Sequence, residues 1–171
     1  MSITNSITPE KQVVLRIAFA EVLRNTTTGQ QQLSSLQAYQ PGDILCSFHA
    51  GETVEQPTYL TVQTGIDRHI TLRPEFLQYI NHSCDPNVFF DTTSFQLVCL
   101  KPIEAGEEFT FFYPSTEWDM ASPFQCYCNQ PGCLGLINGA SHIPEEILKR
   151  YKLSDFIKRK VHYRLRKLKR A

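Results

Sequence analysis

The sequence predicts a mainly β protein built from several small sheets and ending in a helical, basic C-terminal tail. Short apolar segments alternate with turns rich in Pro, Gly, Asp and Thr, and basic residues concentrate after residue 148. The chain has 171 residues, 42% of them hydrophobic and 20% charged, with a formal net charge of zero. This balance excludes a disordered chain. The 8 Gly and 10 Pro follow no period, which excludes collagen-like proteins.

The first half of the chain predicts a series of short strands. Residues 13–23 are apolar but of ambiguous period: Thr8-Pro9 could open a helix, whereas β-branched residues allow a strand equally well. Polar residues 25–32 indicate a loop. After the turn Pro41-Gly42-Asp43, strands are expected at 44–48, 58–62 and 69–72.

The second half predicts a hairpin, an aromatic strand and a helix. The segment 74–80 is brief and helical or irregular, and 88–90 pairs with 95–100 around Asp91-Thr92-Thr93. A strand is expected at 109–113, and apolar residues at helical spacing predict a helix over 144–157. We divide the chain into four parts: an N-terminal segment 1–28, a domain 29–113, a cysteine-rich loop 114–139 and a basic tail 140–171.

The zero net charge hides a strong asymmetry. Eleven of the 17 basic residues follow residue 148, whereas 16 of the 17 acidic residues precede it. An acidic body attracts basic substrates through its summed field. The tail, 149–170, is a candidate for binding nucleic acid, an acidic partner or its own body, although an ordinary solvated helix explains it equally well. No apolar run is long enough for a membrane helix and no secretion signal is apparent, so we expect no membrane partner and an intracellular location, cytoplasmic or, in a eukaryote, nuclear.

Three of the six cysteines form the motif Cys126-x-Cys128-x4-Cys133. Clustered cysteines among turn residues are typical of a zinc site, and a closed structural site needs a fourth ligand. The candidates for that ligand are Cys84, His82, Cys46, Cys99 and His142. Unpaired core thiols are the alternative, and we expect that role for Cys46 and Cys99.

Two further segments carry polar or aromatic groups. In Asn81-His82-Ser83-Cys84-Asp85-Pro86-Asn87, a nucleophilic cysteine with a histidine base is conceivable, but residues two apart in a strand point the same way without facing each other. A plain turn is the other alternative. The segment 106–113 (GEEFTFFY) is by itself an ordinary turn followed by a buried strand.

Together, NHSCDPN, GEEFTFFY and CxCx4C in this order resemble the SET-domain protein-lysine methyltransferases with a post-SET zinc-binding loop. The resemblance covers about residues 29–139. It implies a fold of small β-sheets with a knot-like crossing, and transfer of a methyl group from S-adenosylmethionine to lysine side chains of histone or other basic protein tails. A structural Zn²⁺ is also implied.

The resemblance assigns roles to individual residues. Tyr113, Tyr59 and Phe111 match the active-site tyrosine, a second tyrosine of the lysine channel and the position that influences how many methyl groups are added. The cofactor contacts are expected at Asn81, His82, Tyr113, Leu134 and Leu136. The zinc ligands are expected to be Cys84, Cys126, Cys128 and Cys133.

The sequence departs from the family pattern at three places. Gln30-Gln31-Gln32 stand where a Gly-x-Gly motif is usual, Gln78 replaces a basic residue, and Phe112 replaces an acid before the tyrosine. A non-catalytic, zinc-stabilised module that binds protein or nucleic acid is therefore the alternative function. The chemistry favours the enzyme, because an aromatic channel disfavours the ammonium form of lysine and tyrosine hydroxyls can orient the neutral amine.

Overall fold

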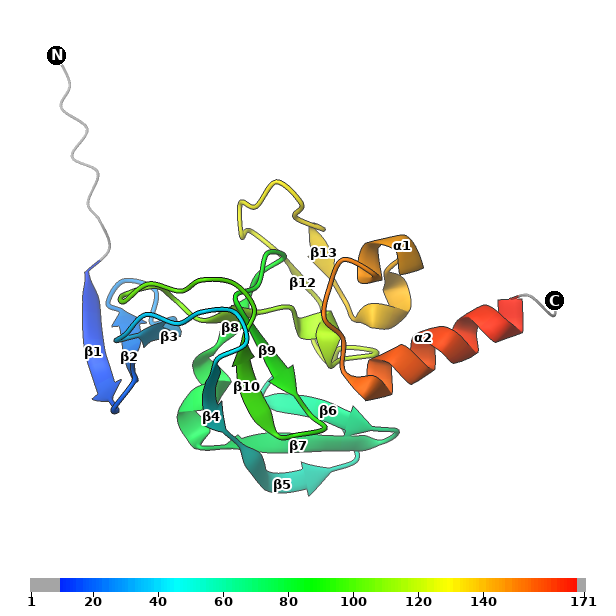
Figure 1. Ribbon diagram of the computed structural model, residues 1–171, viewed down its shortest axis with the longest axis horizontal. Helices are drawn as coiled ribbons and strands as arrows, with labels where there is room; N and C mark the ends of the chain where they lie inside the picture. The colour runs from blue at the N-terminus through cyan, green and yellow to red at the C-terminus, as the bar shows by residue number, and fades with distance from the viewer. Residues whose placement is uncertain (1–9, 169–171) are drawn as a thin grey trace, which may run out of the picture.

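The computed structural model describes residues 10–168, so the possible helix start at Thr8-Pro9 lies outside the described residues. The part described is mainly β, and its strands form five small sheets. Figure 1 shows these sheets packed side by side, with the C-terminal helix projecting at one end. None of the helices within 10–168 is long and apolar enough to cross a lipid bilayer.

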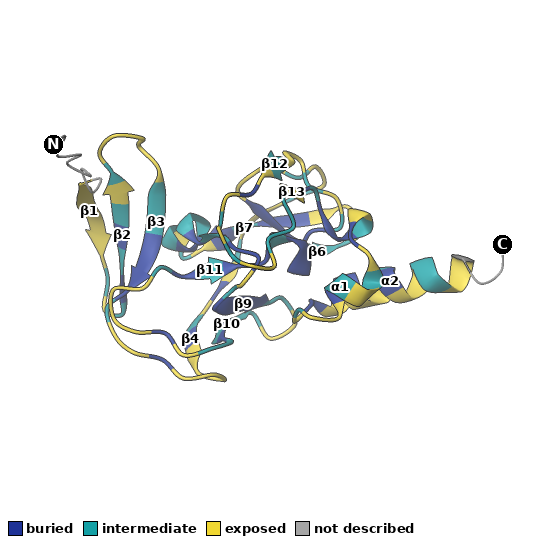
Figure 2. Ribbon diagram, turned by 90° about the horizontal axis from the view of Figure 1, so that it is seen from above, coloured by how far each residue is buried: buried dark blue, intermediate teal, exposed yellow. Residues whose placement is uncertain are grey.

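The apolar segment 13–23, whose sequence allowed either a helix or a strand, forms strands. β1 (Lys11–Arg16), β2 (Ala20–Asn25) and β3 (Gln31–Ser35) make an antiparallel sheet in that order. β3 begins inside the predicted loop 25–32, because Gln31 and Gln32 pair with β2 although neither is apolar. β1 lies at the sheet edge and is exposed along its whole length (Figure 2).

Two three-stranded antiparallel sheets form the centre of the molecule. One has the order β4-β10-β9, with β4 (Ile44–Ser47), β9 (Val88–Asp91) and β10 (Gln96–Cys99), and it contains the predicted hairpin. The other has the order β5-β7-β6, with bounds His49–Val54 for β5, Thr61–Gly65 for β6 and Arg68–Arg73 for β7.

Two details of these sheets differ from the prediction. β5 was not predicted, because its residues are mostly exposed and carry no apolar alternation. The predicted strand 58–62 is shifted: Thr58 to Leu60 form a turn, held by the Thr61 hydroxyl donating to the Thr58 carbonyl oxygen at 3.0 Å. Consequently Tyr59 stands on a loop rather than within a strand.

The main hydrophobic core lies between the sheets and contains aromatic rings from several of them. Phe90, Leu97, Ile103 and Phe109 are completely buried. Phe48 packs edge-on against Phe90 with ring centroids 5.3 Å apart. This rigid centre supports the short elements that carry the polar motifs.

The polar motif and the aromatic strand meet in a two-stranded parallel pair. β8 (Asn81–His82) follows the 3-10 helix η1 (Glu75–Tyr79) and pairs with β11 (Thr110–Phe111). The predicted strand 109–113 is thus only two residues long, because Tyr113 already begins the 3-10 helix η2 (Tyr113–Ser115). This turn directs the chain from the pair towards the cysteine-rich loop.

The C-terminal part combines a small hairpin with short helices. It contains β12 (Phe124–Gln125), β13 (Leu136–Ile137), the 3-10 helix η3 (Ala140–His142), α1 (Glu145–Leu148) and α2 (Asp155–Leu168). The predicted continuous helix 144–157 is wrong. The chain leaves the helix after α1 because Tyr151 stacks on Phe112 at 3.7 Å between centroids and the Ser154 amide donates to the Ser115 carbonyl oxygen.

Candidate functional site

Four cysteines from two distant segments meet at one point. The sulfur atoms of Cys84, Cys126, Cys128 and Cys133 all lie within 4.8 Å of one another. Cys84 follows β8, whereas the other three flank the turn after β12. The spacing motif therefore receives its fourth partner from the NHSC segment, and Cys46 and Cys99 lie elsewhere among the buried strands.

The cysteine cluster fits a tetrahedral metal ion. Zn–S bonds of about 2.3 Å place tetrahedral sulfur atoms roughly 3.8 Å apart, and the Cys84 and Cys126 sulfur atoms are 4.0 Å apart. Burial raises the pKa of the Cys84 thiol, and burial also raises that of Cys126 to about 11. Such thiols become thiolates when a bound cation replaces the lost hydration.

His82 connects the cysteine cluster to Tyr113. Its Nδ1 accepts a hydrogen bond from the Tyr113 amide at 3.3 Å, and its Nε2 lies 3.3 Å from the Cys84 sulfur. Because Nδ1 is an acceptor, the ring proton of the neutral form belongs on Nε2 and faces the sulfur. Burial lowers the pKa of His82 to about 4, so the ring is neutral at pH 7.

This contact corrects the expectation that His82 and Cys84 do not face each other. The turn after β8 brings Cys84 back towards the imidazole, which straight strand geometry does not allow. A hydrolytic pair still does not result, because the sulfur is buried among three other cysteines and the His82 ring bonds to the Tyr113 backbone.

The first of two cavities at this point is an open one of about 620 Å³. Asn81, His82 and Tyr113 line it, together with two of the cysteines. The Asn81 side chain donates to the Gln31 carbonyl oxygen at 3.0 Å and to Glu108 Oε1 at 2.8 Å. The glutamine segment 30–32, which replaces the usual glycine motif, thus still forms a wall of this cavity.

The second cavity is smaller, about 210 Å³, and mostly apolar. Tyr113 and Phe124 line both cavities, so the two cavities adjoin at this aromatic pair. Phe111 lines the second cavity and packs on Tyr113 with centroids 4.6 Å apart. Tyr59 stands at its rim and is 82% exposed.

The Tyr113 hydroxyl is held in its protonated form. It donates a hydrogen bond to the Ile80 carbonyl oxygen at 3.3 Å. Burial, with a smaller contribution from the charge of Glu108, raises the pKa of Tyr113 to about 12. With its proton directed at a carbonyl oxygen, the hydroxyl keeps lone pairs that can accept a hydrogen bond from an amine.

The structure does not bring every expected site residue to the cavities. Leu134 is half-buried between two apolar clusters and Leu136 is 57% exposed; neither lines the two cavities, and their cofactor role stays a prediction. Phe124 was not predicted as a site residue, because in the sequence it has the features of an ordinary loop residue. Glu117 was not predicted either, although an acidic residue four positions after Tyr113 was a visible signal.

Several known proteins are similar in sequence to this chain. "Methyltransferase flvH" of Aspergillus flavus is 38% identical over 140 residues, which cover 81% of this chain and 78% of that protein. The "Histone-lysine N-methyltransferase, H3 lysine-36 specific" of Saccharomyces cerevisiae is 29% identical over 52% of this chain, and that of Schizosaccharomyces pombe 30% identical over 56%. The chain spans only 14% and 13% of the length of these two histone methyltransferases.

One solved structure is similar in fold to this chain. The methyltransferase domain of human histone-lysine N-methyltransferase SETMAR aligns with 72% of this chain and 59% of that chain at a TM-score of 0.51, with 16% sequence identity. At this identity the likeness concerns the fold alone. The sequence itself matches the SET domain over residues 3–114. The chain therefore belongs to the SET-domain methyltransferase family.

Proposed function

We propose that this protein transfers a methyl group from S-adenosylmethionine to the side-chain amine of a lysine in a protein substrate. The observation that carries the proposal is that Tyr113 and Phe124 line both cavities. A cofactor in the larger cavity and an amine in the smaller one would meet beside the Tyr113 ring. The histone-lysine specificity of the distant relatives supports a lysine substrate, such as a histone or another basic protein tail.

The residues of the smaller cavity suit a neutral amine. A lysine in water has a pKa near 10.4 and is almost entirely protonated at pH 7. The apolar walls, which include Phe111 and Phe124, disfavour the ammonium by desolvation. The Tyr113 hydroxyl accepts a hydrogen bond from the amine and orients its lone pair, which contributes to the rate through alignment.

The larger cavity suits the cofactor, which when bound supplies an electrophilic methyl group. Asn81, His82 and the glutamine segment 30–32 would hold it through main-chain and side-chain contacts. We further propose that the four cysteines bind a structural Zn²⁺. Their thiolates match the softness and tetrahedral geometry of zinc, and four protein ligands leave no open position for catalysis.

Calorimetric titration with S-adenosylmethionine and a methyl-transfer assay test this function. We expect binding, labelled methyl-lysine in proteins of a whole-cell lysate, and a loss of roughly 10²-fold in kcat for Tyr113→Phe with cofactor binding retained. No binding at millimolar cofactor would favour the alternative, a non-catalytic zinc-stabilised module. Label found only in low-mass amines, and not in protein, would contradict the protein substrate.

For location and a further partner, we propose an intracellular protein, nuclear if its substrate is a histone, with nucleic acid bound through the basic tail. The distant histone-lysine methyltransferases support the former. The exposed basic residues of α2 support the latter: Arg159, Arg166 and Lys167 face solvent. Lys169 and Arg170 of the tail lie outside the described residues.

A further inference from the structure

A buried carboxylate lies on the wall of the smaller cavity. Glu117 lines this cavity, and its side chain is only 10% exposed. Within residues 10–168 it is the only acidic or basic side chain of the lining, whose other members are apolar or neutral polar. The carboxylate thus has no charged partner in this lining, and a buried charge is costly unless it is paired.

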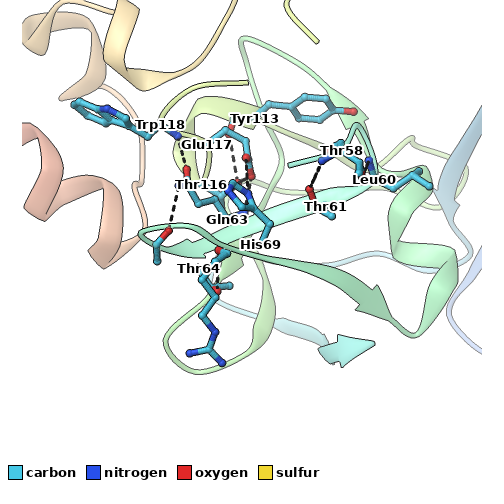
Figure 3. Close-up of polar contacts among 12 residues, drawn as sticks. Thr58, Leu60, Thr61, Gln63, Thr64, His69, Tyr113, Thr116, Glu117 and Trp118 are labelled. Carbon is cyan, nitrogen blue, oxygen red and sulfur yellow. Dashed lines mark hydrogen bonds and ion pairs between the residues drawn. The ribbon is translucent and has the colours of Figure 1, made fainter. Parts of the chain in front are cut away.

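Hydrogen bonds hold one oxygen of this carboxylate and leave the other free. Oε1 accepts from the Gln63 amide at 2.7 Å and from the Thr116 hydroxyl at 3.2 Å (Figure 3). Oε2 lies 3.9 Å from His69 Nδ1, beyond hydrogen-bond distance, and accepts no hydrogen bond from the described residues. The carboxylate is therefore fixed in orientation with one oxygen available to a donor.

No cation of the described part of the chain neutralises Glu117. Among residues 10–168, no lysine or arginine nitrogen lies within 4.0 Å of it. His69 is only 4% exposed, and its Nδ1 makes no hydrogen bond with the described residues. Burial lowers the pKa of His69 despite the opposing charge of Asp67, so the imidazole is neutral at pH 7.

Glu117 does not face the reacting amine. Tyr113 and Glu117 leave the same turn, because the Glu117 amide donates to the Tyr113 carbonyl oxygen. Figure 3 shows the phenol ring of Tyr113 and the carboxylate of Glu117 pointing in different directions. An amine placed at the Tyr113 hydroxyl thus leaves the carboxylate to a different group of the substrate.

We propose that Glu117 is a specificity-determining residue that binds a second positively charged group of the substrate, a lysine or arginine flanking the methylated lysine. This inference rests on the proposed methyl transfer to protein lysine and adds the substrate class. A guanidinium or ammonium donating to Oε2 would pair the isolated carboxylate, and such charge-assisted hydrogen bonds are the strong ones. The acidic body of the chain would draw in a substrate with two positive charges.

The test uses synthetic peptides with one central lysine in a Gly/Ser background and one arginine at a varied flanking position. Matched peptides carry citrulline, the neutral isostere of arginine. We expect the wild-type protein to prefer arginine in kcat/KM by roughly 10-fold or more at one flanking position, the contribution of one charge-assisted hydrogen bond. Glu117→Gln, which retains an acceptor for the Gln63 amide, should abolish this preference.

Asp119→Asn is the matched control variant. Asp119 carries the same charge close to Glu117 in sequence, but it is exposed, pairs with His142 and does not line the smaller cavity. This variant should keep the arginine preference, which separates a direct contact from the general field of the acidic body. Equal preference in the wild-type protein and Glu117→Gln, or methylation by the wild-type protein without any preference for arginine, overturns the proposal.

Peptide binding measured by fluorescence anisotropy distinguishes a failure of the proposed methyl transfer from a failure of the proposed role of Glu117. If no peptide is methylated but arginine peptides still bind more tightly to the wild-type protein than to Glu117→Gln, the proposed methyl transfer is wrong and the role of Glu117 stands. If peptides are methylated at equal rates whatever their flanking charge, methyl transfer stands and the role of Glu117 is wrong.

Discussion

At the scale of single residues, burial raises the pKa of two side chains in one short turn after β11, with opposite consequences for their charge near neutral pH. For Tyr113, burial raises the pKa to about 12 and keeps a hydroxyl that is protonated at every physiological pH. For Glu117, burial raises the pKa to about 7, against the lowering effect of the bonds from Gln63 and Thr116, so its charge forms near neutral pH. The turn thus supplies a constant hydrogen-bonding group and a titratable one.

The raised pKa of Glu117 predicts a pH-dependent stability. The folded protein keeps this proton up to about pH 7, whereas the unfolded chain loses it near pH 4.5. The contribution of Glu117 to the free energy of unfolding is therefore fully present below pH 4.5 and is lost as pH rises towards 7. The shift corresponds to about 3 kcal/mol. We expect urea unfolding to show that Glu117→Gln gains stability relative to the wild-type protein between these values. A difference independent of pH would contradict this.

Phe111 predicts the number of methyl groups added. Its ring packs on Tyr113 and lines the smaller cavity without a polar atom, which would leave room there for a methylated amine. We expect di- or trimethyl-lysine from the wild-type protein. Phe111→Tyr should shift the product towards monomethyl-lysine, because the added hydroxyl occupies space beside Tyr113. Mass spectrometry of the product distinguishes these states, and a wild-type product that stops at monomethyl-lysine would contradict the prediction.

How far the site could be predicted differs from residue to residue. The cysteine motif predicted a metal site because ligand spacing is a local property, and the resemblance supplied Cys84. Phe124 and Glu117 were missed because their place depends on tertiary packing: β12 brings Phe124 against Tyr113, and the contact with Gln63 in β6 fixes Glu117. Neither partner is near in sequence.

At the scale of elements, a strand or helix was predicted correctly where its residues show a clear pattern of burial. The prediction failed where contacts with distant parts of the chain determine the local structure. The hairpin β9–β10 has buried residues and a polar turn, and its position was predicted correctly. The exposed β5 and the two-residue strands β12 and β13 carry no such signal. The helix predicted over 144–157 is interrupted because the Tyr151 hydroxyl donates to the Cys84 carbonyl oxygen and its ring stacks on Phe112.

The loop between β12 and β13 predicts a dependence on metal. Its cysteines gather around Cys84, and the Leu134 amide donates to the Cys84 sulfur at 3.4 Å, so the loop is joined to the NHSC segment through the cysteine cluster. Removing bound metal with a chelator should increase hydrogen exchange of residues 120–138 and weaken the proposed cofactor binding, because Cys126 and Cys128 also line the larger cavity. We expect elemental analysis to find one zinc per chain in untreated protein.

Two serine variants separate the metal site from thiol loss in general. Cys84→Ser should lose zinc and show the same increased exchange. Cys46→Ser removes a half-buried thiol outside the cluster and should retain full zinc content. Protein purified without chelators and free of zinc would contradict the assignment.

At the scale of the whole molecule, the C-terminal helix is both anchored and extended. Phe156, Ile157 and Val161 of α2 are buried against the body. Arg164 donates to the carbonyl oxygens of Ser141 and Ile143, and it lies over the Trp118 ring. The basic tail is therefore partly a structural element. Figure 1 shows the later turns of α2 projecting from the body, away from the sheets that carry the cavities.

This division of α2 shows which residues of the tail can test the proposed binding of nucleic acid. Arg166 and Lys167 are exposed in the last turn and make no ion pair with the described residues, so their charges are available to phosphates. Replacing both by Gln should weaken duplex DNA binding and reduce the slope of log K against log salt by about 2, since each phosphate contact contributes about 0.9. Methyl transfer to a short peptide should not change. The double variant Arg68→Gln, Arg73→Gln removes equal charge from exposed positions of β7 and should leave the slope unaltered. If both double variants bind DNA like the wild-type protein at low salt, the tail is an ordinary solvated helix, and any nucleic-acid binding resides elsewhere on the chain.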